Sequence, residues 1–188
     1  KSKKIFIFKK TQISLYSHMG CIDSRDLISE GEIGEHTRDI TSVVFIKESH
    51  HFIGSDSDKK LKFWNAKEKK CEHTIDAPTL GCMALSSDGS KLYGGANVVI
   101  VFDIRKKYPI FEYPPFSKEI IKKILVPETS DLIYVLTKDN VLGTLNVKKG
   151  QVQEVCQSYK GKKVTDIALN PKENRVVFVL DEAEDNFQ

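Results

Sequence analysis

A repeat of about 40 residues is the feature of this sequence that most restricts its fold. Each copy has an apolar stretch, a polar turn and a second apolar stretch. The four copies cover residues 42–54, 82–95, 122–135 and 166–179. Equivalent apolar residues precede the turn at Phe45, Leu85, Leu125 and Leu169, and follow it at Phe52, Leu92, Leu132 and Val176. A period of this length indicates supersecondary units that are stabilised by their neighbours.

Each copy is predicted to contain β-strands. Its apolar residues alternate or run together over short stretches, and Ser, Asp, Gly, Pro or Asn bound these stretches, which is typical of strands. Third strands are expected at 61–65, 98–104 and 141–147, and shorter fourth strands near 70–75, 110–113 and 151–156. Four short antiparallel strands in about 40 residues form one blade of a β-propeller. The predicted fold class is therefore all-β, built from propeller blades.

The strand count predicts an incomplete propeller of about four to five blades, because each blade takes about 40 to 45 residues. Residues 1–188 are interpreted as one partial propeller domain. Its expected divisions are a partial blade (1–33), three complete blades (34–75, 76–115 and 116–157) and a second partial blade (158–188). A small closed propeller is the alternative, but it would leave a strand at 175–181 over. We favour a fragment of a longer propeller, which agrees with a sequence that begins with Lys1 rather than Met.

Residues 34–65 resemble a WD repeat. His36 takes the place of the His in that family's Gly-His dipeptide, and Trp64 that of the aromatic residue in its Trp-Asp dipeptide. Asp58 lies six residues before Trp64, as the family's turn Asp does. The resemblance implies a buried hydrogen-bonded network of these three side chains, which would fix the loop on the blade. Gly54 stands where the family has a Ser or Thr, so we expect the network to be incomplete.

The resemblance is weaker in the later units. Asp139 lies six residues before Leu145 and is the equivalent of Asp58, so the resemblance implies a structural role for it too. The third unit keeps Phe102 and Asp103 but has Ala96 at the turn position. The WD-type pattern therefore extends over most of the chain but depends on one well-preserved blade.

Composition and charge exclude several classes of protein. Lys and Arg total 29 against 26 Asp and Glu, and the net charge of +3 is too small to define a nucleic-acid or membrane-surface binder. No uncharged apolar run approaches the roughly 18 residues that a membrane helix needs. The four cysteines are widely spaced, which indicates a reducing compartment. We expect an intracellular protein, in the cytoplasm or nucleus, without membrane association.

The residue types of catalytic and metal sites have simpler structural explanations here. His36, Ser55 and Asp58 could form a nucleophilic triad, but no Gly-x-Ser-x-Gly motif surrounds Ser55. His50 and His51 are adjacent, so an extended chain would point them to opposite faces. We expect no catalytic residue, no metal ion, no cofactor and no small-molecule substrate.

The partner-binding surface is predicted from the repeat register. In propellers of this type, residues that enter the first strand of each blade form part of the rim that faces partners. These candidate rim residues are Arg38, Asp39, Thr79, Lys118, Glu119 and Lys163. Their mixed charges suit a protein surface better than a phosphate backbone. The predicted function is a non-catalytic scaffold for protein–protein interactions, a WD-repeat propeller subunit or fragment within a larger intracellular complex. Its partners are other proteins or the rest of its own propeller.

RNA is the alternative partner. Lysine clusters at 67–70, 105–107 and 160–163 fall in expected loops, with Tyr108, Tyr113 and Tyr159 as aromatic neighbours. This pattern would suit an RNA-associated propeller subunit of a ribonucleoprotein assembly, such as one in ribosome biogenesis. Solvated turns explain the lysines more simply, and the scaffold hypothesis is favoured.

Overall fold

The computed structural model describes residues 3–18, 28–47, 49–115, 117–156, 162–170 and 175–181. Within these ranges the chain forms β-strands and no helix, and therefore no helix that could span a membrane. The predicted all-β class and the four-stranded antiparallel sheets are confirmed. The chain divides into two compact units, Lys1–Leu80 and Gly81–Gln188.

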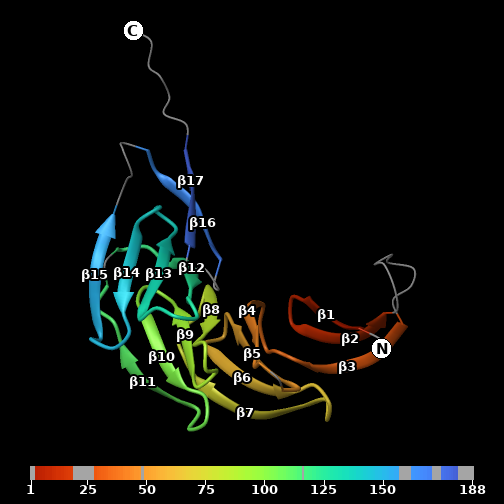
Figure 1. The fold of residues 1–188 in the computed structure, drawn as a ribbon. Coiled ribbons are helices and arrows are strands. Elements are labelled where there is room, and N and C mark those ends of the chain that lie inside the picture. The colour runs from red at the N-terminus through yellow and green to blue at the C-terminus, as the bar shows by residue number, and fades with distance from the viewer. Residues whose placement is uncertain are drawn as a thin grey trace. The chain divides into compact units, whose positions relative to one another are not determined.

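The unit Lys1–Leu80 contains two antiparallel sheets (Figure 1). The first sheet has the strand order β1-β2-β3 and consists of β1 (Lys3–Lys9), β2 (Gln12–His18) and β3 (Ile28–Glu35). The second has the order β4-β5-β6-β7 and consists of β4 (Ile40–Phe45), β5 (His51–Asp56), β6 (Lys60–Asn65) and β7 (Lys70–Asp76). We refer to this second sheet as blade β4–β7.

The unit Gly81–Gln188 contains three antiparallel sheets. Blade β8–β11 consists of β8 (Cys82–Leu85), β9 (Lys91–Gly95), β10 (Val99–Asp103) and β11 (Tyr108–Glu112). Blade β12–β15 consists of β12 (Ile121–Leu125), β13 (Leu132–Thr137), β14 (Leu142–Asn146) and β15 (Gln151–Cys156). A two-stranded sheet follows, with β16 (Val164–Asn170) and β17 (Arg175–Leu180).

The apolar positions aligned across the first turn pair directly in three of the four repeats. Phe45 lies opposite Phe52, Leu85 opposite Leu92, and Leu169 opposite Val176. In the remaining repeat the register is shifted, and Leu125 lies opposite Tyr134 instead of Leu132. The turn of this hairpin contains Pro127, which has no N–H to donate and so cannot extend the ladder.

Tight turns join the strands within each blade, and several of them place a non-glycine residue in the left-handed region. Lys59, Lys69 and Lys107 have φ values of 58°, 54° and 58°, and Asn140 has a φ of 65°. Such residues carry a conformational cost, which the surrounding hairpin must offset. Lys59 and Lys69 are exposed in their turns, whereas Lys107 is half-buried.

Neighbouring blades in the unit Gly81–Gln188 share one apolar core. Tyr93, Val101 and Tyr113 of the first blade and its outgoing segment pack with Ile121 and Ile133 of the next blade. Gly95 makes this approach close, because a Cβ there would lie 2.8 Å from Cγ2 of Ile121. Within this unit, neighbouring sheets therefore bury apolar surface against each other, as stacked repeats do.

Candidate protein-interaction site

His36 lies at the centre of a buried network in blade β4–β7. Its Nδ1 is 2.8 Å from Oδ2 of Asp56, and both side chains are fully buried. Trp64 donates its indole N–H to Nε2 of His36, with 3.3 Å between the nitrogens. An indole N–H can only donate, so Nε2 must be the acceptor and Nδ1 carries the hydrogen that is donated to Asp56. His36, Asp56 and Trp64 form what we call the histidine network, and it requires the neutral imidazole.

The electrostatics agree with this assignment. Burial lowers the pKa of His36, and this effect outweighs the opposing hydrogen bond and charge of Asp56. Protonation would also place a second N–H of His36 against the indole N–H, where two donors would face each other. The network is thus stable with a neutral His36 and is weakened by its protonation.

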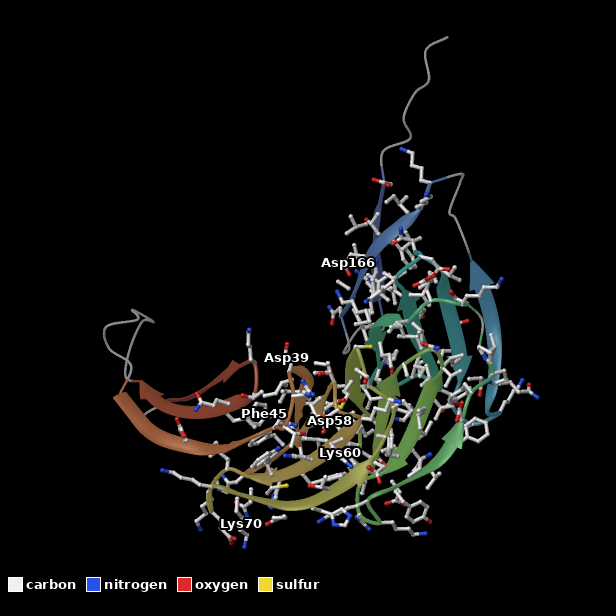
Figure 2. All side chains as sticks on the ribbon, turned by 180° about the vertical axis from the view of Figure 1, so that it is seen from behind. Asp39, Phe45, Asp58, Lys60, Lys70 and Asp166 are labelled. Atoms are coloured by element: carbon white, nitrogen blue, oxygen red, sulfur yellow. The ribbon has the colours of Figure 1, made fainter. Side chains whose placement is uncertain are left out.

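The prediction that Asp58 is the acid of this network is wrong, because Asp56 takes that role. Asp58 is exposed in the β5–β6 turn (Figure 2), and its Oδ2 accepts a hydrogen bond from Oγ1 of Thr37 at 3.0 Å. Oδ1 of Asp56 accepts the backbone N–H groups of Asp58 and Lys60, each at 3.0 Å, and so also shapes the turn.

Strand alternation explains the position of Asp56, although it does not by itself distinguish Asp56 from Asp58 two residues further on. Side chains two apart in a strand share one face, so Phe52, Gly54 and Asp56 lie on the same face of β5. Phe52 stacks on Trp64, with ring centroids 6.1 Å apart. A Cβ on Gly54 would lie only 2.6 Å from Nε2 of His36. This position therefore needs glycine for the close approach of His36, and the network is formed without the family's Ser or Thr.

Ser55 makes contacts that do not suit a nucleophile. Its Oγ accepts hydrogen bonds from Oγ1 of Thr41 and from the backbone N–H of Leu80, each at 3.3 Å. Both ring nitrogens of His36 are engaged by Asp56 and Trp64, so neither is available to accept a proton from Ser55. The histidine network is consequently structural.

In the part of the chain that the structure describes, no three His, Cys, Asp or Glu side chains come together in a way that could hold a metal ion. Of the adjacent histidines, His51 lies near a carboxylate, with Nε2 3.4 Å from Oε2 of Glu72.

Asp139 occupies the β13–β14 turn and is exposed. Its carboxylate accepts hydrogen bonds from Oγ of Ser117, at 2.9 and 2.7 Å to its two oxygens, and from Oγ1 of Thr137. The bond from Thr137 is the largest of the effects that lower the pKa of Asp139. Asp139 therefore connects this turn to the segment that leads into β12.

Asp58 and Asp139 play the same role in their two blades. Thr37 donates to Asp58 as Ser117 donates to Asp139, and each donor lies just before the first strand of its own blade. We call these two contacts the turn ties. Each holds the segment that carries a pair of candidate rim residues, Arg38 and Asp39 in one blade and Lys118 and Glu119 in the other.

The candidate rim residues lie where the register predicts, at the entries to the first strands, but they belong to separate units. Arg38, Asp39 and the half-buried Thr79 lie in Lys1–Leu80, whereas Lys118, Glu119 and Lys163 lie in Gly81–Gln188. All of these except Thr79 are exposed. Each unit thus presents charges of both signs, and the unit Lys1–Leu80 also presents the hydroxyl of Thr79.

Two contacts join the first strands β12 and β16, and the sequence pattern did not reveal them. Lys122 donates to the carbonyl of Thr165 at 2.9 Å, and Lys123 pairs with Oδ1 of Asp166 at 2.8 Å. Asp166 is marked on β16 in Figure 2. A lysine and an aspartate in the first strands of neighbouring repeats could have suggested the second contact, whereas a bond to a backbone carbonyl leaves no signal in the sequence.

The comparisons with known proteins agree with this geometry. Residues 28–65 match the family model described as WD domain, G-beta repeat. The match begins at the first residue of β3, so the sequence repeat crosses the boundary between two sheets. The predicted resemblance is therefore confirmed for this segment.

Solved WD40 structures have the same fold. The structure titled "Structure of U3-55K" has a TM-score of 0.63 and 13% identity, and the match covers 76% of this chain and 52% of that one. The structure titled "Crystal structure of RRP9 WD40 repeats" has a TM-score of 0.63 and 14% identity, with coverage of 76% and 51%. The chain spans about half the length of each. No match was found among curated protein sequences. The described sheets thus have the fold of WD-repeat β-propellers.

Proposed function

We propose that this protein is a non-catalytic scaffold that binds other proteins within a larger intracellular complex, in the cytoplasm or nucleus. The observation that carries the proposal is the pair of turn ties, which hold exposed charges of both signs at the entries to two blades. A segment that is already held in place loses less conformational freedom on binding than a mobile one, which favours the tied segments as a binding surface. Mixed charges favour complementary protein surfaces and disfavour a uniform polyanion.

Charge reversal tests the rim. The intact protein is affinity-tagged in its own cells, purified with and without nuclease, and its co-purifying proteins are identified. We expect Arg38→Glu and Lys118→Glu to deplete part of the partner set, because reversed rim charges repel a complementary surface. Arg105→Glu and Lys67→Glu are the matched controls, since both residues are exposed in turns between third and fourth strands. A partner set that is the same in all four variants would overturn the proposed rim.

RNA contact is the second candidate, and one observation favours it. Nζ of Lys106 lies 5.9 Å from the ring centroid of Tyr108, whose side chain is 45% exposed, so a cation and an aromatic face are presented together. Tyr159 and Lys160, which the sequence also suggests for this role, lie outside the described residues. A partner set that collapses after nuclease treatment, with RNA affinity that falls steeply as salt rises, would favour this candidate over the protein scaffold.

A further inference from the structure

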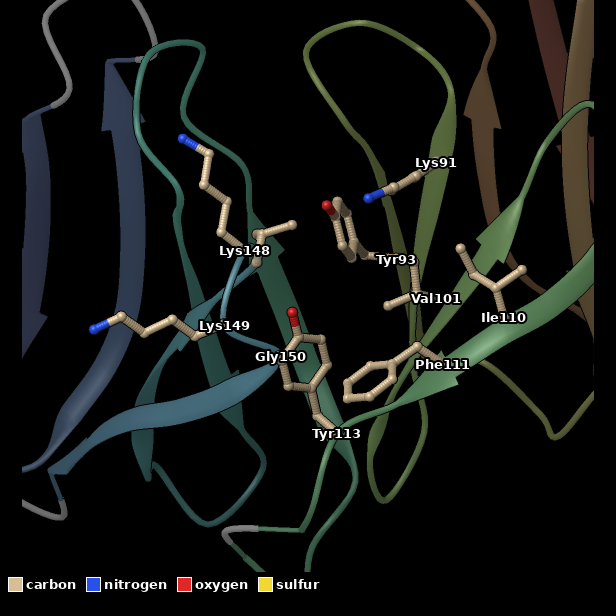
Figure 3. Close-up of a pocket in the computed structure, with 10 residues that line it drawn as sticks. Lys91, Tyr93, Val101, Ile110, Phe111, Tyr113, Lys148, Lys149 and Gly150 are labelled. Atoms are coloured by element: carbon tan, nitrogen blue, oxygen red, sulfur yellow. The ribbon is translucent and has the colours of Figure 1, made fainter.

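A pocket of about 320 Å³ lies between blades β8–β11 and β12–β15, within the unit Gly81–Gln188. Three aromatic residues, Tyr93, Phe111 and Tyr113, form much of its wall, and Lys91, Lys148 and Lys149 surround it (Figure 3). It is bordered by turns that join first to second strands and third to fourth strands. The candidate rim residues lie elsewhere, in the segments that lead into the first strands. The pocket is therefore a separate surface.

The aromatic wall is well ordered by packing. Tyr93 and Tyr113 are each 2% exposed and belong to the apolar core that the two blades share. Phe111 is 44% exposed and meets Tyr113 edge to face, with ring centroids 5.0 Å apart. Gly150 of the next blade leaves room for Phe111, because a Cβ there would lie 3.2 Å from its Cζ. The pocket thus has a rigid floor and one exposed apolar ring at its edge.

The charges around the pocket do not cancel. Lys148 pairs with Asp131 at 2.8 Å. Lys91 and Lys149 have no acidic partner among the residues that the structure describes. Figure 3 shows Lys91 and Lys149 on opposite sides of the pocket. The aromatic wall is therefore flanked by two cationic groups that are available to a ligand.

A second hollow, of about 220 Å³, adjoins the first and shares Lys91, Tyr93 and Val147 with it. Its other lining residues include Asp88 and Asp131 and several serines. Hydrogen bonds from Ser86 and Ser90 lower the pKa of Asp88 to about 2, so this carboxylate is charged at neutral pH. The two hollows form what we call the inter-blade groove, which is aromatic and cationic at one end and hydroxylic and acidic at the other.

We infer that the inter-blade groove binds an extended peptide segment of a partner protein, with an aromatic side chain between the two blades. An acidic residue beside this aromatic anchor would pair with Lys91 or Lys149, and a hydroxyl or basic residue would face Asp88. The first hollow is at the small end of the usual range of roughly 300–1,000 Å³, which suits one side chain. A nucleic-acid strand along the groove would bring its phosphates against the carboxylate of Asp88. This inference rests on the proposed scaffold function and names the chemistry of one partner.

A random peptide-display library, selected on the intact protein, tests the inference. We expect enrichment of peptides with an aromatic residue next to an acidic one. The most enriched peptide is then synthesised, and its affinity is measured for the wild type and for Lys91→Glu, Lys149→Glu and Phe111→Ser. Each variant should weaken binding by roughly tenfold or more, because it removes a charge partner or the edge of the aromatic wall. Lys67→Glu, in the equivalent turn of blade β4–β7, should leave the affinity unchanged.

Other outcomes would overturn the inference. These are a library without enrichment, enriched peptides whose binding does not depend on Lys91 and Lys149, or a single-stranded polyuridylate probe that binds and is lost in Lys91→Glu. The scaffold proposal is judged separately, from the proteins that co-purify with the wild type. If every one of those proteins remains bound in the Lys91→Glu variant, the groove fails while the scaffold stands. If no protein co-purifies, the scaffold proposal fails.

Discussion

Single hydrogen-bond donors decide the protonation of His36. The indole of Trp64 can only donate, and it therefore selects the imidazole form that donates to Asp56. Asp56 itself is held in place by the two backbone N–H groups of the turn that follows it. Three side chains, none of them on the surface, thus determine how the segment before β4 is attached to its blade.

The lowered pKa of His36 predicts a loss of stability in acid. Its pKa in the unfolded chain is near 6.5 and its pKa in the folded protein is lower, so the unfolded state binds more protons between these two values. The contribution of neutral His36 to the free energy of unfolding is fully present above pH 6.5. It is lost as the pH falls from there towards the pKa of His36 in the folded protein. The free energy of unfolding of the intact protein in urea, measured between about pH 5 and 8, checks this.

His36→Asn is the control for this pH dependence. The variant should be less stable at every pH, because a buried partner of Asp56 and Trp64 is shortened. Its stability should nevertheless vary less with pH than that of the wild type. If the free energy of unfolding changes equally with pH in the two proteins, other groups cause the acid sensitivity.

At the scale of strands and turns, the turn ties predict which segment loosens when an aspartate is lost. Asp139→Ala removes the acceptor of both Ser117 and Thr137. We expect about 1 kcal/mol of local destabilisation, or roughly fivefold faster amide hydrogen exchange in the segment before β12. Hydrogen exchange measured by mass spectrometry checks this.

Asp131→Ala is the matched comparison for Asp139→Ala. Asp131 is also an exposed aspartate of blade β12–β15, but its partner Lys148 lies away from the segment before β12. Exchange near Ser117 should not change in this variant. If amide exchange near Ser117 accelerates equally in both variants, the tie between Ser117 and Asp139 is not specific.

At the scale of the whole chain, stability depends on blades that share their cores. Ile121 is 1% exposed and packs with residues of two blades, whereas its neighbour Ile120 is 37% exposed. Ile121→Ala should cost about 2–5 kcal/mol through lost burial and a residual cavity. Ile120→Ala should change the stability by no more than about 0.5 kcal/mol. Urea unfolding of both variants in the intact protein checks this, and equal losses would contradict a core shared across blades.

The local structure could be predicted from the amino-acid sequence alone. Alternating apolar residues predicted the strands, and turn residues predicted the hairpins. The residues that the repeat aligned on either side of the first turn, Phe45 with Phe52 and Leu85 with Leu92, lie opposite each other in the structure. These features depend on residues close together in the chain, so a pattern can reveal them. The equivalence of Asp58 and Asp139 was visible for the same reason.

Contacts between side chains that are far apart in the sequence depend on the tertiary fold. Asp56 and not Asp58 faces His36, because burial depends on the face of β5 that the loop before β4 covers. The inter-blade groove needs Tyr93 and Lys149 from different blades, and no spacing relates them. Local patterns determine strands through backbone geometry, whereas such contacts arise from the way the blades pack, which many residues determine together.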